Sequence, residues 1–191
     1  MEQIRECRAR ARKRRTSRGL TLVELLIVVA IVGVLAVIAV VSYKKIVASS
    51  RVSEATHMVQ GIRAAQDRYK AETGSYANIS SSINQFYPAA TPGAFKTQWG
   101  GPCTLCTTGW NALALKPDGP LEFGYATVAG PASAAATAIT FADGNTVSWP
   151  TSNTGPWFIV QARGDTDGNG KFCSVVGSSY NNTLTINEEG E

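Results

Sequence analysis

Histidine is nearly absent from this sequence, since His57 is the only one among 191 residues. A single imidazole has no second histidine with which to form a metal or catalytic pair, so we interpret His57 as a solvated or packing residue. The sequence also lacks a Ser-His-Asp set, a P-loop, paired catalytic acids and a dinucleotide-binding fingerprint. We therefore expect neither an enzyme nor a resident cofactor.

Charged residues are missing from Leu25 to Val41. Counted from Leu20, the apolar run spans roughly 33 Å as a helix, enough to cross a bilayer core of about 30 Å. A removable secretory signal is disfavoured, because the run is long and helix-periodic sequence follows it instead of a small-residue cleavage site. Residues 20–41 are predicted to form a membrane-spanning helix.

Acidic residues are scarce in the segment before this run. Residues 1–19 contain eight basic residues and two acidic ones, a net charge of +6. Positive flanks stay on the cytoplasmic side of a membrane, so the C-terminal body is predicted to lie outside. Because this leader accounts for the positive charge of the chain, its basic character does not indicate a nucleic-acid partner.

Glu24 is the one charged residue inside the apolar run. A carboxylate in hydrocarbon costs several kcal/mol unless it reaches the interface or finds a partner. Proteolysis after Gly19 would create an amino group on Leu20, and that cation could neutralise Glu24 of a neighbouring chain. The alternative is that Glu24 lies at headgroup depth, where a carboxylate is tolerated.

The stretch RGLTLVELLIVVAIVGVLA, residues 18–36, resembles the N-terminal signature of the type IV prepilin family. The resemblance implies cleavage by an inner-membrane prepilin peptidase between Gly19 and Leu20, with N-methylation of Leu20. It implies that Glu24 neutralises the N-terminal amine of a neighbouring subunit during assembly, with Thr21 near that contact. Gly33 matches the position at which many pilins have a helix-weakening glycine.

Two positions depart from the family pattern. Most members begin the mature chain with Phe, where this sequence has Leu20. Many members have Pro at the position of Val41. Because Val41 keeps its N–H and does not clash with the preceding turn, a proline-linked kink is not expected.

The helix is predicted to continue to Thr73, with residues 42–73 forming an amphipathic second half. Apolar residues recur there at three- and four-residue steps, which indicates one face packed against something. Gly74 is suited to end the helix. The predicted stripe consists of Val52, Ala55, Val59, Ile62 and Tyr69, with Met58 and Ala65 beside it.

Beyond Gly74 the composition changes. Residues 74–120 are rich in Ser, Thr, Asn, Gly and Pro, which predicts a long αβ-loop draped on the surface. Residues 121–191 contain β-rich runs, two of which flank a hairpin signal at residues 143–145. The predicted fold class is α+β: a long helix over about 20–73 whose C-terminal half packs on a small antiparallel sheet. The prepilin resemblance implies the same pilin fold. The predicted strands lie in 121–129, 137–142, 146–149, 156–162, 172–176 and 183–186.

The four cysteines fall on two sides of the predicted membrane. Cys7 lies in the leader, whereas Cys103, Cys106 and Cys173 lie on the oxidising side, where disulfides persist. We favour a bridge from Cys173 to Cys106 or Cys103, which closes a loop of about 70 residues and is worth about 4 kcal/mol in the entropic account. A redox or metal role for the single CxxC is disfavoured, because no further ligand cluster is visible.

The motif DTDGNG at 165–170 is the other candidate for a chemical site. Asp165, Asp167 and Asn169 alternate and precede Gly170, as in the first half of a calcium-binding loop. The twelfth position is Val176 instead of a bidentate Glu, which excludes a complete EF-hand. A looser calcium site and a tight Asp/Gly turn both remain open.

Together with the charge pattern, the prepilin resemblance implies a precursor that inserts in the bacterial inner membrane, with its leader in the cytoplasm and its C-terminal domain in the periplasm. After cleavage the mature chain is expected to self-associate, through the inner-membrane pilus assembly machinery, into a helical homopolymer or mixed pilus at the cell surface. Such a type IV pilus would act in adhesion, twitching motility or DNA uptake. The alternatives are a pseudopilin of a type II secretion system and an uncleaved single-pass anchor for a periplasmic domain. Glu24 argues against the tip-type pseudopilins, which usually lack it.

Overall fold

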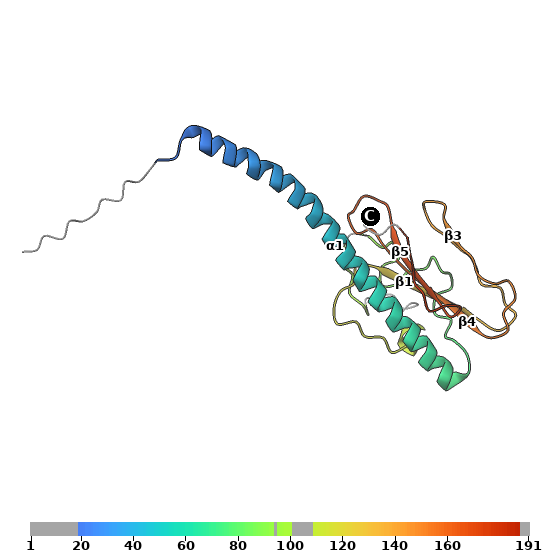
Figure 1. The fold of residues 1–191 in the computed structure, drawn as a ribbon. Helices are drawn as coiled ribbons and strands as arrows, with labels where there is room; N and C mark the ends of the chain where they lie inside the picture. Colours follow the sequence, from blue (N-terminus) through green and yellow to red (C-terminus); the bar gives the residue numbers. More distant parts are fainter. Residues whose placement is uncertain (1–18, 94, 101–108, 188–191) are drawn as a thin grey trace, which may run out of the picture. The chain divides into compact units, whose positions relative to one another are not determined.

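The computed structural model describes residues 19–93, 95–100 and 109–187. Within these residues one long α-helix precedes six β-strands, and a short helical turn covers residues 109–112. Figure 1 shows the long helix and the strands of the C-terminal part. The chain divides into two units, residues 1–41 and 42–191, which are described separately. The elements are α1 (Leu22–Thr73), β1 (Gly124–Gly130), β2 (Ile139–Thr140), β3 (Thr146–Val147), β4 (Trp157–Gly164), β5 (Cys173–Ser178) and β6 (Thr185–Asn187).

Helix α1 is a single uninterrupted helix of 52 residues. It ends where Gly74 takes a φ of 82°, a left-handed conformation that glycine adopts without steric penalty. The Gly74 N–H donates to the Lys70 carbonyl at 2.8 Å and so satisfies one carbonyl of the last turn. No proline interrupts the helix, which is continuous through Val41.

Four strands form an antiparallel sheet in the order β1-β4-β5-β6. Strand β4 lies at the centre, with Gly124 of β1 opposite Arg163 and Cys173 of β5 opposite Gly164. Strands β2 and β3 form a separate two-stranded hairpin, whose turn places Gly144 at a φ of 86°. The hairpin predicted from residues 143–145 is therefore present.

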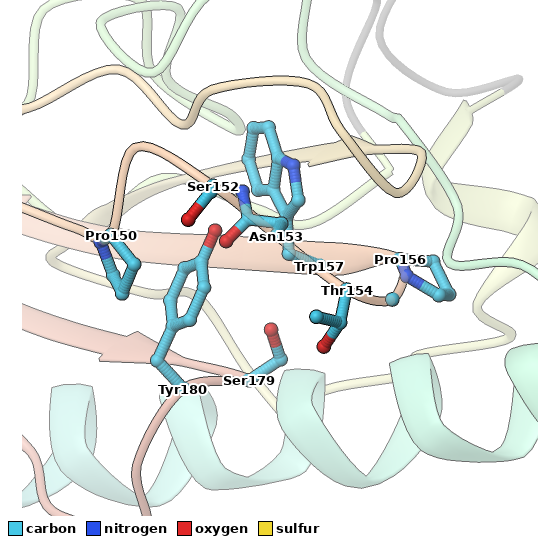
Figure 2. A pocket seen from close by; sticks show the side chains of 9 residues that line it. Pro150, Ser152, Asn153, Thr154, Pro156, Trp157, Ser179 and Tyr180 are labelled. Atoms are coloured by element: carbon cyan, nitrogen blue, oxygen red, sulfur yellow. The ribbon is translucent and has the colours of Figure 1, made fainter.

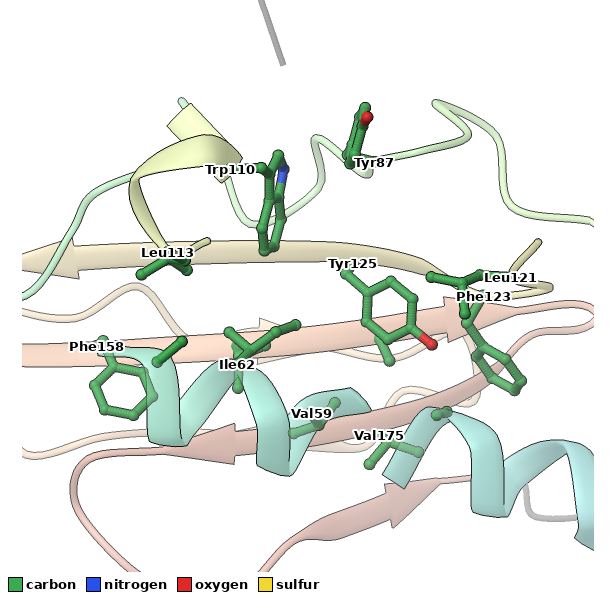
Figure 3. Close-up of a cluster of buried hydrophobic side chains, with 14 of the residues drawn as sticks. Val59, Ile62, Tyr87, Trp110, Leu113, Leu121, Phe123, Tyr125, Phe158 and Val175 are labelled. Atoms are coloured by element: carbon green, nitrogen blue, oxygen red, sulfur yellow. The ribbon is translucent and has the colours of Figure 1, made fainter. Parts of the chain in front are cut away.

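The second half of α1 packs against one face of the sheet. Val59 and Ile62 are fully buried and point toward Tyr125 and Val175 (Figure 3). Each large apolar side chain buried in this way contributes about 1.5–3 kcal/mol by removal from water. The buried helix residues are Ala48, Val52, Ala55, Val59, Ile62, Ala65 and Gln66, a stripe at the predicted three- and four-residue steps.

The opposite face of the sheet is covered as well. Strand β4 alternates, so that Phe158 and Val160 belong to the cluster on the helix side while Trp157 and Ile159 belong to a second cluster. The second cluster is completed by the β2–β3 hairpin and by the segment between α1 and β1. The residues from those regions are Ile83, Phe86, Ile139 and Phe141.

The polar composition of the segment between α1 and β1 predicts a loop on the surface, but part of this segment belongs to the core. Tyr87, Trp110 and Leu113 are at most 3% exposed and belong to the cluster that includes the helix. Ile83 and Phe86 of this segment are buried too, whereas Phe95 is 88% exposed. The fold class, a long helix whose C-terminal half packs on a small antiparallel sheet, is confirmed.

Candidate functional site

The apolar first half of α1 has no covering layer within the described chain. Its large hydrophobic residues between positions 20 and 41 are 51% to 81% exposed. Among the described residues, α1 is the one helix long and apolar enough to cross a membrane. An exposed apolar surface of this extent requires lipid or other protein segments to cover it.

Glu24 and Thr21 are brought together at the start of this helix. The Glu24 carboxylate accepts hydrogen bonds from the Thr21 N–H at 2.9 Å and from the Thr21 hydroxyl at 2.8 Å. In return, the Thr21 hydroxyl oxygen accepts the Glu24 N–H at 3.2 Å. This reciprocal pair is a capping box, which satisfies backbone donors that a helix start leaves unpaired. Its Thr-x-x-Glu spacing is visible in the sequence, but the predicted role of both residues was a contact with a neighbouring subunit and not a helix cap.

The other residues of the predicted processing and assembly site are accessible. A side chain added at Gly19 would meet no atom within 4 Å, and Leu20 is 77% exposed. Gly33 lies within α1 and also has open space around it. Cleavage between Gly19 and Leu20, and an assembly role for Gly33, remain predictions for this exposed segment.

The DTDGNG loop is held together by its own first carboxylate. Asp165 is 8% exposed and accepts backbone N–H bonds from Gly168, Asn169 and Gly170 at 2.8 to 3.1 Å. Asp167 accepts from the Asn169 backbone and side chain. These bonds form a closed turn between β4 and β5. Within the described residues no group of three or more His, Cys, Asp or Glu side chains converges to hold a metal ion.

Calcium binding at this loop remains a prediction with a direct test. If Asp165, Asp167 and Asn169 bind calcium, excess calcium raises the melting temperature above that measured in chelator, because a ligand that binds only the folded state stabilises it. Asp167→Ala, an exposed position, should then remove the increase. Equal melting temperatures in calcium and chelator would identify the loop as a turn alone.

Cys173 is buried at the start of β5. Its two predicted disulfide partners, Cys103 and Cys106, lie outside the described residues. The bridge from Cys173 to one of them stays a prediction.

Comparison with known proteins centres on the same N-terminal segment. The family described as "Prokaryotic N-terminal methylation motif" matches residues 14–40. The chain is 36% identical over 80 residues to the fimbrial protein EcpC of Eikenella corrodens, and 40% identical over 67 residues to the type IV major pilin protein PilA of Myxococcus xanthus. It is 38% identical over 71 residues to the type IV major pilin protein PilE1 of Neisseria gonorrhoeae. Its N-terminal segment is thus similar to those of type IV pilins and fimbrial proteins.

The likeness is confined to part of the chain. The three alignments cover 39%, 35% and 37% of the chain, and the chain spans 52%, 30% and 43% of the length of those relatives. No solved structure matches the chain.

A charged network links α1 to the sheet domain. Glu122 is 3% exposed, and its carboxylate lies 2.7 Å from the Arg51 guanidinium, which also donates to the Thr166 carbonyl. Glu54 accepts the Glu122 N–H at 3.1 Å and pairs with Lys96 at 3.2 Å. The network links the helix to the entry of β1 and, through Thr166, to the DTDGNG loop.

This network predicts a pH dependence of stability. Burial raises the pKa of Glu122 above 4.5, Arg51 opposes that shift and Glu54 adds to it. A carboxyl with a higher pKa in the folded state binds more protons there, so its contribution to the unfolding free energy falls as pH rises through the raised pKa. As the pH rises from about 4.5 to the raised pKa, the unfolding free energy of the wild type should therefore fall relative to that of Glu122→Gln. Denaturant titrations at several pH values measure this, and parallel curves for the two proteins would contradict it.

Proposed function

We propose that this chain is a structural subunit of a type IV pilus. The observation that carries the proposal is the exposed apolar segment of residues 20–41. Glu24 lies near its start, and the N-terminal methylation motif matches residues 14–40. The similar proteins that are named as major pilins or fimbrial proteins support it. The role is structural, in adhesion, twitching motility or DNA uptake, and not catalytic.

Burial of the exposed half-helix stabilises both the membrane-anchored precursor and the assembled filament. In the precursor, residues 20–41 anchor the chain in the inner membrane, where lipid covers the apolar side chains. In the filament, the same side chains pack against other copies, with burial worth about 25 cal/mol per Å². The C-terminal domain faces the periplasm before assembly and the cell exterior afterwards.

Processing connects the two states. A prepilin peptidase cuts between Gly19 and Leu20 and methylates the new Leu20 amine. The inner-membrane assembly machinery then inserts the subunit into a growing filament. There the amine of one chain neutralises Glu24 of its neighbour, with Thr21 close by and Gly33 allowing the helix to adjust.

A pseudopilin of a type II secretion system is the second candidate, and its N-terminal segment would be processed in the same way. What separates the two is location, because a pilus extends from the cell surface whereas a pseudopilin works within the envelope. The described relatives named as pilins favour the pilus.

Peptide mass spectrometry of material sheared from native cells tests the proposal. A methylated peptide that begins at Leu20 in the sheared fraction is the expected result. The same peptide confined to the envelope would support the pseudopilin instead. A protein that still begins at Met1 would overturn both readings and support an uncleaved anchor.

Gly19→Val is the matched variant for the processing step. The side chain added at Gly19 meets no atom of this chain, so the variant should fold normally. It should nevertheless accumulate as precursor, because it replaces the glycine that the prepilin signature has at the cleavage position. Normal appearance of the Leu20 peptide from this variant would remove the assignment of the peptidase.

A further inference from the structure

A small cavity lies at the end of the sheet where β4 begins and β5 has just ended. It has a volume of about 270 Å³ and is lined by the loop 150–156, Trp157, Ser179 and Tyr180 (Figure 2). Pockets for drug-sized ligands begin at about 300 Å³, so this cavity has room for a ligand of about one ring.

The chemistry of this cavity is neutral and polar. Among the described residues, none of the side chains that line it carries a charge. Hydroxyl groups come from Ser152, Thr154, Ser179 and Tyr180, and an amide comes from Asn153. An anionic or cationic ligand would find no counter-charge here, whereas a ligand with several hydroxyls would find both donors and acceptors.

Two of these polar groups have capacity left for a ligand. The Tyr180 hydroxyl is buried beside Asn153 (Figure 2), yet it makes no hydrogen bond of ordinary geometry with any described group. Burial raises the pKa of Tyr180, and the neighbouring Asn153 side chain opposes that shift; the net rise keeps the proton on the hydroxyl. The Asn153 amide nitrogen donates to the Ala134 carbonyl at 2.7 Å. Its oxygen lies beside the Tyr180 hydroxyl (Figure 2) and, with two lone pairs, can also accept from a ligand.

The walls of the cavity are fixed before any ligand arrives. Tyr180 stacks on Trp149 with ring centroids 5.5 Å apart and an interplanar angle of 18°. The Trp157 indole N–H donates to the same Ala134 carbonyl, at 2.8 Å. Fixed aromatic walls reduce the side-chain ordering that binding would otherwise require.

We propose that this cavity binds a neutral saccharide, one pyranose ring entering between the Tyr180 side and the loop 150–156. A sugar ring presents C–H groups to an aromatic wall and hydroxyls to polar groups, which matches a cavity lined by aromatic and uncharged polar residues. The Tyr180 hydroxyl donates to a sugar oxygen and the Asn153 oxygen accepts from a sugar hydroxyl. The site does not depend on filament assembly, so its test is separate from that of the proposed function.

Saturation-transfer NMR on the full chain, in a detergent without a sugar headgroup, tests this site. The probes are methyl β-glucoside, methyl β-galactoside and methyl β-glucuronide. The glucuronide differs from the glucoside by a carboxylate, so it is expected to bind at least about tenfold more weakly. Preference between the two neutral probes distinguishes a terminal galactose of a cell-surface glycan from a glucan as the source of the ligand.

Three variants locate the binding. Thr154→Trp, at an exposed position, should fill the cavity and abolish the signal, and Tyr180→Phe should weaken binding about fivefold by removing one hydrogen bond. Tyr76→Phe is the matched control, since its hydroxyl contacts Lys70 and Asp67 away from the cavity, and it should bind as the wild type does. Absence of binding by either neutral probe, equal binding of the glucuronide, or wild-type affinity in Thr154→Trp would each overturn the proposal.

Discussion

Glu24→Gln is expected to reduce the yield of sheared filaments by more than about tenfold, while cleavage after Gly19 continues. Glutamine occupies the third position of a capping box as glutamate does, so the hydrogen bonds from Thr21 are retained. What the variant removes is the negative charge. If the N-terminal amine of a neighbouring subunit is buried against Glu24, loss of the carboxylate charge leaves that cation unpaired. Leaving a buried charge unpaired typically costs about 3–5 kcal/mol.

Two comparison variants separate charge from capping. Thr21→Val removes the hydroxyl of the capping box and keeps the carboxylate, so filament yield should fall less than in Glu24→Gln, the cap itself being worth about 1 kcal/mol. Glu72→Gln changes an exposed carboxylate near the other end of α1 and should not affect yield. Electron microscopy and quantification of sheared material measure all three. Normal filaments from Glu24→Gln would mean that the residue acts only as a helix cap.

The N-terminal segment was the part most readily predicted from sequence. Its features are local: a basic leader, Gly19, and an apolar run that no charged residue interrupts after Glu24. The helix and its buried stripe follow from the same kind of periodic signal, and the structure confirms burial of Val52, Val59 and Ile62. Strand positions were also predictable, because β-rich runs alternate with turn residues.

What sequence reasoning missed depends on contacts between distant residues. The inward packing of Tyr87 and Trp110 is set by the sheet they cover, and the polar composition of their segment gives no sign of it. The capping role of Glu24 has a local Thr-x-x-Glu signal, in which the nearest donor to the carboxylate is Thr21 of the same chain. Gln66 falls four residues after Ile62 in the buried stripe, a position where an apolar residue would be expected.

Gln66 can be fully buried because its side-chain amide forms hydrogen bonds with the backbone of Ala77, as another backbone amide would. Its nitrogen donates to the Ala77 carbonyl at 2.8 Å and its oxygen accepts the Ala77 N–H at 2.9 Å. The nitrogen also donates to the Thr127 hydroxyl at 3.2 Å, which reaches β1. One side chain therefore connects the helix, the segment that follows it and the first strand.

Gln66→Leu is expected to lower the unfolding free energy by about 2–4 kcal/mol, because it leaves two buried polar groups of Ala77 without partners. Leucine is apolar and of similar size, so loss of hydrogen bonding and not loss of volume is the main change. For a chain of this size the melting temperature should fall by about 5–15 °C. Circular dichroism during thermal and denaturant unfolding of the full chain in detergent measures both quantities.

Gln60→Leu is the matched control, since Gln60 lies on the exposed side of the same helix and its oxygen accepts only a long 3.3 Å bond from Arg63 among the bonds described. It should change the unfolding free energy by no more than about 0.5 kcal/mol. If Gln66→Leu were as stable as Gln60→Leu, the Ala77 groups would have to be hydrated in the variant, and the helix would be held to the sheet by apolar packing alone. If it is destabilised as expected, a polar residue in the apolar stripe fixes where the segment after the helix begins its path across the sheet.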